Sequence, residues 1–146
     1  MTTMTEVQTT QVYQVFIRAT PEQIWDAITK PEFTSKYFHG VTIDTTPSVR
    51  QTYYHGELAN EVEVLEWDPP RKLVHGWRAL YDPELAVEGT SRVTWEIEPQ
   101  DGGYSKLTLV HDQLEDAPKT AESVAGGWSF VLSGLKTLLE TGETLA

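Results

Sequence analysis

The alternation of apolar and polar positions predicts a strand near the start of the chain. Between residues 12 and 18, Tyr13, Val15 and Ile17 fall on one face and more polar positions fall on the other. An alternation of this kind is typical of a strand with at least one buried side. The pattern changes at Thr20, where a helical period begins.

Two short helices are expected directly after this strand. The motif Thr20-Pro21-Glu22-Gln23 combines a threonine cap, a proline at the first helical position and a glutamine three residues after the cap. Ile24 and Ile28 then give the first helix an apolar face. Pro31 ends this helix, because the residue before a proline disfavours the helical conformation, and it opens a second helix that reaches about residue 37.

Beyond Gly40 the period becomes two, which predicts a meander of antiparallel strands. Asp68-Pro69-Pro70 and Gln100-Asp101-Gly102-Gly103 are the clearest turns between them. The longer segment of residues 79–90 contains proline, glycine and acidic residues, and we expect a mobile loop at one end of the sheet. The predicted strands cover residues 41–44, 49–54, 61–67, 72–78, 91–98 and 104–111.

A long C-terminal helix is predicted for residues 120–140, because Val124, Trp128, Val131 and Leu135 recur at steps of four and three. Its apolar stripe needs a large apolar surface, and the inner face of the sheet is the one available. We therefore expect an α+β fold in which six or seven antiparallel strands curve around this helix. Residues 11–146 form one predicted domain, and residues 1–10 a disordered lead.

Composition excludes several classes of function. The 146 residues include 22 acidic and 11 basic side chains, a net charge of −11, and no cysteine. Thiol chemistry and cysteine-ligated metal sites are therefore excluded, and an acidic surface argues against nucleic acid as a partner. No segment has the roughly 18 apolar residues of a membrane-spanning helix. Because residues 1–10 lack the pattern of a secretory signal, we expect a cytoplasmic protein without stable membrane insertion.

The facing strands predict an inner surface rich in large side chains. A turn centred near Gly102 pairs Ile97 with Leu107, Trp95 with Leu109, and Val93 with His111. Large aromatic side chains with a few polar tips are typical of a small-molecule cavity. The residues expected to line such a ligand-binding cavity are Tyr53, His75, Trp77, Trp95, His111 and Trp128.

Each of these features has a plainer interpretation. Tryptophans between a sheet and a helix are often core residues, and a histidine on an apolar face is often a satisfied polar group. Gly126-Gly127 costs the last helix on the order of 1 kcal/mol per glycine. Either the missing side chains leave space for a ligand or for a close approach of the sheet, or the helix begins only near Gly127. The four histidines show no metal-ligand spacing, so neither a metal site nor a cofactor is predicted.

Several motifs occur in an order that resembles a known superfamily. They are ATPEQIWDAIT at residues 19–29, EWDPPRKLV at 66–74, SRVTW at 91–95, LTLVH at 107–111, and Gly127-Trp128 followed by Leu132, Leu135 and Leu139. This order resembles the START-like (SRPBCC, Bet v 1-like) superfamily, and within it the branch named after the activator of heat shock protein 90 ATPase. The resemblance implies a helix-grip fold, in which an antiparallel sheet wraps a long C-terminal helix around a hydrophobic cavity.

Three functions are consistent with that resemblance, because fold alone does not fix function. The first is binding of a hydrophobic or aromatic small molecule in the cavity. The second is a polyketide cyclase or aromatase, in which His75 or His111 exchanges protons with the substrate. The third is interaction with a chaperone or regulator through the acidic surface. No catalytic residue is assigned, and formation of a homodimer is left open.

Overall fold

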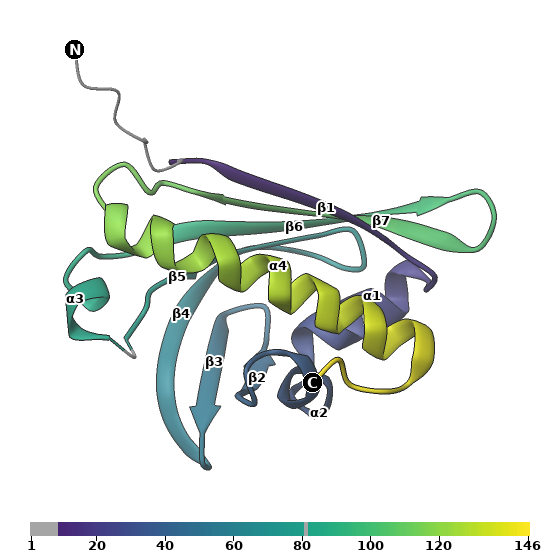
Figure 1. Cartoon of the computed structure of the whole chain (residues 1–146), viewed down its shortest axis with the longest axis horizontal. Coiled ribbons are helices and arrows are strands. Elements are labelled where there is room, and N and C mark those ends of the chain that lie inside the picture. Colours follow the sequence, from purple (N-terminus) through teal and green to yellow (C-terminus); the bar gives the residue numbers. More distant parts are fainter. Residues whose placement is uncertain (1–8, 81) are drawn as a thin grey trace.

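The computed structural model describes residues 9–80 and 82–146, so the predicted lead lies largely outside the described residues. A seven-stranded antiparallel sheet, in the order β1-β7-β6-β5-β4-β3-β2, curves around one long helix (Figure 1). The strands are β1 (Gln11–Ile17), β2 (Thr42–Thr45), β3 (Val49–Tyr54), β4 (Glu57–Asp68), β5 (Lys72–Trp77), β6 (Ser91–Gln100) and β7 (Tyr104–Asp112). The helices are α1 (Pro21–Thr29), α2 (Pro31–Tyr37), α3 (Pro83–Ala86) and α4 (Pro118–Thr141). The predicted α+β helix-grip architecture is confirmed.

The start of α1 follows from its first four residues. The Thr20 hydroxyl accepts a hydrogen bond from the Gln23 amide at 3.2 Å, and the Gln23 side chain accepts one from the Thr20 amide at 2.9 Å. Two backbone donors that the helix itself leaves free are thereby satisfied. The chain then turns at Lys30, whose backbone is extended, and Pro31 begins α2.

The register of the β6-β7 hairpin is the predicted one. Val93 faces His111, Trp95 faces Leu109 and Ile97 faces Leu107. The turn at residues 101–103 contains two glycines with positive φ, a conformation that fits glycine best. Because side chains alternate between the two faces of a strand, this register directs Trp95 and His111 to the same inner face.

Strand β4 begins earlier than predicted, at Glu57 rather than at residue 61. A tight turn at His55-Gly56, both with positive φ, folds Glu57 back onto Tyr54 and pairs Leu58 with Tyr53. Residues 57–60 do not alternate clearly between apolar and polar, so the sequence pattern does not show that the strand begins here. The extension lengthens the part of the sheet that curves away from β6 and β7 (Figure 1).

The segment expected to be a loop contains the short helix α3, which begins after Asp82. The end of this segment, after α3, is held against α4. The Glu88 carboxylate accepts hydrogen bonds from the Thr120 amide at 2.7 Å and from the Lys119 amide at 3.1 Å. Ala117, the residue at the N-cap position of α4, supplies no side-chain cap of its own. Glu88 therefore caps α4 from outside the helix.

Helix α4 crosses the concave side of the sheet (Figure 1), and its inward residues Val124, Trp128, Val131 and Leu135 are buried. It begins at Pro118, so the interpretation that it starts near Gly127 is wrong. No helix in the described part of the chain is long and apolar enough to cross a membrane.

Candidate ligand-binding cavity

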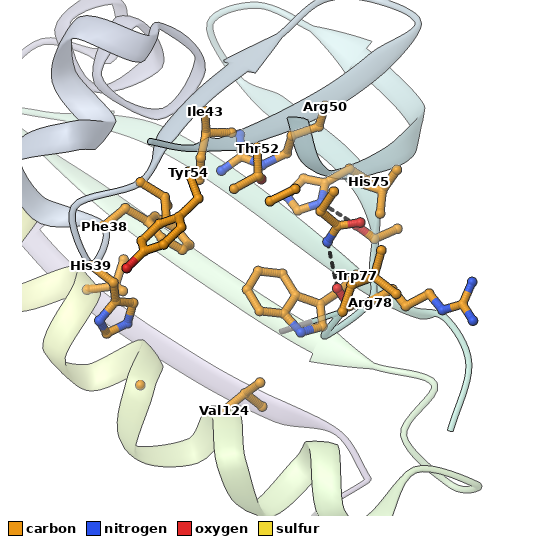
Figure 2. A pocket seen from close by; sticks show the side chains of 18 of the residues that line it. Phe38, His39, Ile43, Arg50, Thr52, Tyr54, His75, Trp77, Arg78 and Val124 are labelled. Carbon is orange, nitrogen blue, oxygen red and sulfur yellow. Dashed lines mark hydrogen bonds between the residues drawn. The ribbon is translucent and has the colours of Figure 1, made fainter. Parts of the chain in front are cut away.

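A cavity of about 630 Å³ lies between α4, the end of α2 and strands β2 to β5 (Figure 2). Its inner wall consists of buried side chains, namely Phe38, Ile43, Arg50, His75, Val124, Trp128 and Val131. Its rim consists of exposed residues, among them His39, Tyr54, Arg78, Leu80 and Ser123. The cavity is therefore walled mainly by apolar groups and reaches the surface at one side.

Strand β3 contributes one of its two faces to the cavity. Arg50, Thr52 and Tyr54 alternate onto the cavity face, as Figure 2 shows. Tyr53 does not line the cavity, and its hydroxyl donates a hydrogen bond to the Gln51 side chain at 3.1 Å. The expectation that Tyr53 lines the cavity is wrong, because both faces of β3 carry polar and aromatic residues and the sequence does not show which face turns inward.

The other five expected residues form one aromatic cluster. His75, Trp77 and Trp128 line the cavity. Trp95 and His111 are fully buried and do not line it; their ring centroids lie 5.6 and 5.9 Å from that of Trp128. Trp95 and His111 pack behind Trp128, on the side away from the cavity. The expectation that these two residues line the cavity is therefore wrong.

His75 is held as a neutral ring by its neighbours. The Trp95 indole N–H donates to His75 Nε2 at 2.9 Å, and His75 Nδ1 lies 2.7 Å from the Gly76 carbonyl oxygen. An indole nitrogen only donates and a carbonyl only accepts, so the proton of His75 is on Nδ1. Burial is the main cause that lowers the pKa of His75 well below its ordinary value, and the nearby Arg50 charge adds to it.

His111 repeats this arrangement between the sheet and α4. The Trp128 indole N–H donates to His111 Nδ1 at 2.9 Å, and His111 Nε2 lies 2.6 Å from the Ser91 hydroxyl. The Ser91 hydroxyl in turn donates to the Trp77 carbonyl at 3.5 Å, so it accepts the proton of Nε2. Burial lowers the pKa of His111 to about 4. Both ring nitrogens of each histidine are thus occupied by protein groups.

Arg50 is a cavity residue that the sequence analysis missed. Its side chain is 3% exposed, and Nη1 donates to the Ile28 carbonyl at 3.0 Å and to the Thr45 hydroxyl at 2.7 Å. Burial lowers the pKa of Arg50 to about 10, so the guanidinium is charged at neutral pH. Its alternation with Thr52 and Tyr54 was the available signal, but an arginine in a polar strand is normally expected at the surface.

Gly126 and Gly127 of α4 differ from Gly134, which lies about two turns further along the same helix. A Cβ built at Gly126 or Gly127 meets no heavy atom within 4 Å, whereas one at Gly134 lies 3.2 Å from Cβ of Tyr37. A close approach of the sheet therefore does not explain Gly126 and Gly127. Gly127 lines the cavity and its missing side chain leaves the space open, while Gly126 is exposed on the helix surface.

The described residues contain no group of three His, Asp or Glu side chains that could hold a metal ion.

A family model described as "Activator of Hsp90 ATPase homolog 1-like protein" matches residues 18–140. The chain belongs to this family. The match covers α1 through most of α4, and so includes every residue that lines the cavity. Membership in the Hsp90 ATPase activator homolog family confirms the resemblance seen in the sequence motifs.

Solved structures share this fold. A protein from Mesorhizobium loti has a TM-score of 0.70 and 21% identity, over 89% of this chain and 96% of that one. The Aha1 dimer from Colwellia psychrerythraea has a TM-score of 0.72 and 16% identity, over 92% and 98%. An HSP90 activator from Plasmodium falciparum has a TM-score of 0.72 and 18% identity, over 90% and 96%. At these identities the likeness shows the fold, and no curated protein matches the chain in sequence.

Proposed function

We propose that this protein binds a hydrophobic or aromatic small molecule in the cavity between β2 to β5 and α4. The cavity itself carries the proposal: at about 630 Å³ it falls within the range of roughly 300 to 1,000 Å³ that is usual for small-molecule sites. Its wall is rich in aromatic and aliphatic side chains, whose burial against a ligand is favourable by about 25 cal/mol per Å² before ordering costs.

The rings of the aromatic wall pack closely against one another, which favours binding. Trp77 packs against Trp128 with ring centroids 5.1 Å apart and against His111 at 5.7 Å, and Phe38 packs against Trp128 at 5.9 Å. Trp128 is fixed in turn by its hydrogen bond to His111. A wall that is already ordered loses little conformational entropy when a ligand binds.

Gly127 supports the same proposal. A glycine inside a helix costs on the order of 1 kcal/mol relative to alanine, and no neighbouring atom requires one at this position. Because a side chain at Gly127 would extend into the cavity, the glycine preserves the volume that a ligand needs.

The experiment uses N-phenyl-1-naphthylamine, a neutral dye whose emission rises in an apolar environment. We expect saturable binding to the wild-type protein and a loss of affinity of about tenfold or more in Gly127→Leu, because the leucine fills the cavity. Gly126→Leu is the matched control, since it makes the same change on the exposed face. Absence of saturable binding to wild type, or equal binding by both leucine variants, contradicts the proposal.

The contacts of His75 and His111 give no support to the cyclase alternative. A general acid or base needs a ring nitrogen within hydrogen-bond reach of the substrate, and all four nitrogens of these rings already have protein partners. Their lowered pKa values also keep both rings neutral at neutral pH.

A second candidate function is interaction with an Hsp90-type chaperone, and family membership is the observation that favours it. The test is stimulation of the chaperone's ATPase by this protein at increasing salt. With a net charge of −11, a charge-driven contact weakens strongly as ionic strength rises. Gly127→Leu separates the two candidates, because it blocks the cavity and leaves the acidic surface unchanged.

A further inference from the structure

The buried polar atoms without a partner gather around the cavity. In residues 9–80 and 82–146, the buried side-chain nitrogen and oxygen atoms without a hydrogen bond are Arg50 Nη2, Trp77 Nε1 and Asn60 Oδ1. All three residues line the cavity. An unsatisfied buried polar group costs about 1 to 3 kcal/mol, and more when it is charged. Polar atoms left free in this one place indicate the positions of polar groups on a ligand.

Arg50 gives the strongest indication of the three, because its guanidinium is charged and is held in one position. Nη1 is fixed between the Ile28 carbonyl and the Thr45 hydroxyl, and the guanidinium carbon lies 6.0 Å from the Trp95 ring centroid. Figure 2 shows Arg50 on the side of the cavity opposite Val124 of α4. Nη2 is therefore a donor held in place beside the apolar wall.

The charge of the cavity is opposite to that of the protein. Of 22 acidic residues in the chain, none is among the described lining residues, whereas Arg50 and Arg78 are. No described carboxylate lies close enough to Arg50 to form an ion pair, although seven ion pairs occur elsewhere in the described part of the chain. A buried cation without an anion on its own chain fits a ligand that brings one.

We propose that the ligand is a hydrophobic monocarboxylic acid whose carboxylate binds Arg50 and whose apolar body lies against Trp77 and α4. This inference rests on the proposed function and names its ligand class. A carboxylate oxygen accepts from Nη2 in a charge-assisted hydrogen bond, the kind that Arg forms best. Trp77 Nε1 and Asn60 Oδ1 remain for a further polar group on the same ligand.

The test compares acids with alcohols of the same body as competitors of N-phenyl-1-naphthylamine: decanoate with 1-decanol, and 2-naphthoate with 2-naphthylmethanol. At about pH 8 both acids are ionised. We expect the acid of at least one pair to bind about tenfold more tightly than its alcohol, the effect of one hydrogen bond to a charged group. The pair that shows the larger preference for the acid indicates whether the apolar part of the ligand is alkyl or aromatic.

Arg50→Met assigns that preference to one residue. We expect the advantage of acid over alcohol to disappear in Arg50→Met and to persist in Arg71→Met, which removes the same charge from the exposed pair with Asp68. A preference that persists in Arg50→Met, or that disappears in Arg78→Met instead, overturns the inference. Circular dichroism verifies that each variant is folded.

A measurement on wild type does not depend on the folding of Arg50→Met. In decanoate labelled with ¹³C at its carboxyl group, an adjacent guanidinium lowers the pKa of the bound acid below its value in water, whereas an apolar wall raises it. A raised pKa overturns the inference. Alcohols that bind as well as acids also overturn it but leave the proposed function intact, while failure of the dye and of all four competitors to bind removes both.

Discussion

Trp128 of α4 donates its indole N–H to Nδ1 of His111 on β7 at 2.9 Å, and this bond joins the helix to the sheet at the centre of the grip. Trp95 and His75 form the same pair between β6 and β5. In both pairs the tryptophan can only donate, so the histidine must keep a lone pair directed at it. Protonation of either histidine would set two N–H groups against each other, and the bond would be lost.

The first prediction is that the protein loses stability between pH 6.5 and 4. The unfolded chain takes up protons at its histidines near pH 6.5, whereas burial lowers the pKa of folded His111 to about 4. Stability is therefore full above about pH 6.5 and falls as the pH decreases, by about 3 kcal/mol for His111 at 1.36 kcal/mol per pH unit. His75 adds to the loss in the same direction.

Urea unfolding at several pH values measures this loss. His111→Gln is the informative variant, because its amide retains an acceptor for Trp128 and does not titrate. Its free energy of unfolding should depend less steeply on pH than that of the wild type between pH 6.5 and 5. Equal slopes in the two proteins would show that His111 has the same pKa in the folded and the unfolded state, which would contradict the prediction.

The second prediction concerns two glycines of the same helix. Gly126→Ala should raise the free energy of unfolding by about 1 kcal/mol, because the position is exposed, helical and free of neighbours. Gly134→Ala should lower it, because the new Cβ lies 3.2 Å from Cβ of Tyr37. Tyr37 cannot retreat easily, since it is buried and its hydroxyl donates to the Ala27 carbonyl at 2.6 Å. Denaturation at neutral pH measures both, and a gain at Gly134 equal to that at Gly126 would contradict the close packing of α2 on α4.

The third prediction is that Glu88 stabilises the start of α4. Burial acts to raise the pKa of Glu88, but hydrogen bonds from Thr120 and Lys119 hold it below its ordinary value. Glu88→Ala should cost about 1 kcal/mol, as does the loss of a helix cap, and this stabilisation should disappear in the wild type as the pH falls through the lowered pKa. Hydrogen exchange at the Lys119 and Thr120 amides should accelerate. Glu84→Ala is the control, because the one described partner of the Glu84 carboxylate is the exposed Lys119 ammonium, at 3.4 Å.

The parts of this fold that the sequence predicts are those with a local cause. Thr20 and Gln23 cap α1 through neighbouring residues, and the glycine turn fixes the register that sets Val93 opposite His111. His75 and Trp77 line the cavity as predicted, and they lie two residues apart on one face of β5. In each case the deciding contact lies within a helix or across one hairpin.

The parts that the sequence does not predict depend on contacts between distant elements. The sequence predicts Tyr53 in the cavity, yet the other face of β3, which carries Arg50 and Tyr54, turns inward. The hydrogen bond of Trp128 to His111 depends on how α4 lies across the sheet, which its period does not specify. The burial of Arg50 and its unpaired Nη2 both depend on the packing of β3 against distant elements, which the sequence does not specify.

The fourth prediction is that Thr45 positions Arg50. The Thr45 hydroxyl accepts from Arg50 Nη1 at 2.7 Å and is itself buried. Thr45→Val removes that acceptor with little change in volume, so it should destabilise the protein by about 1.5 to 3 kcal/mol, as expected for a hydrogen bond to a charged group. It should also reduce the preference for decanoate over 1-decanol, because the guanidinium is then held only through the Ile28 carbonyl. Thr45→Ser, which restores the hydroxyl, should recover the preference; if valine and serine variants both keep the wild-type preference, Thr45 contributes to stability alone.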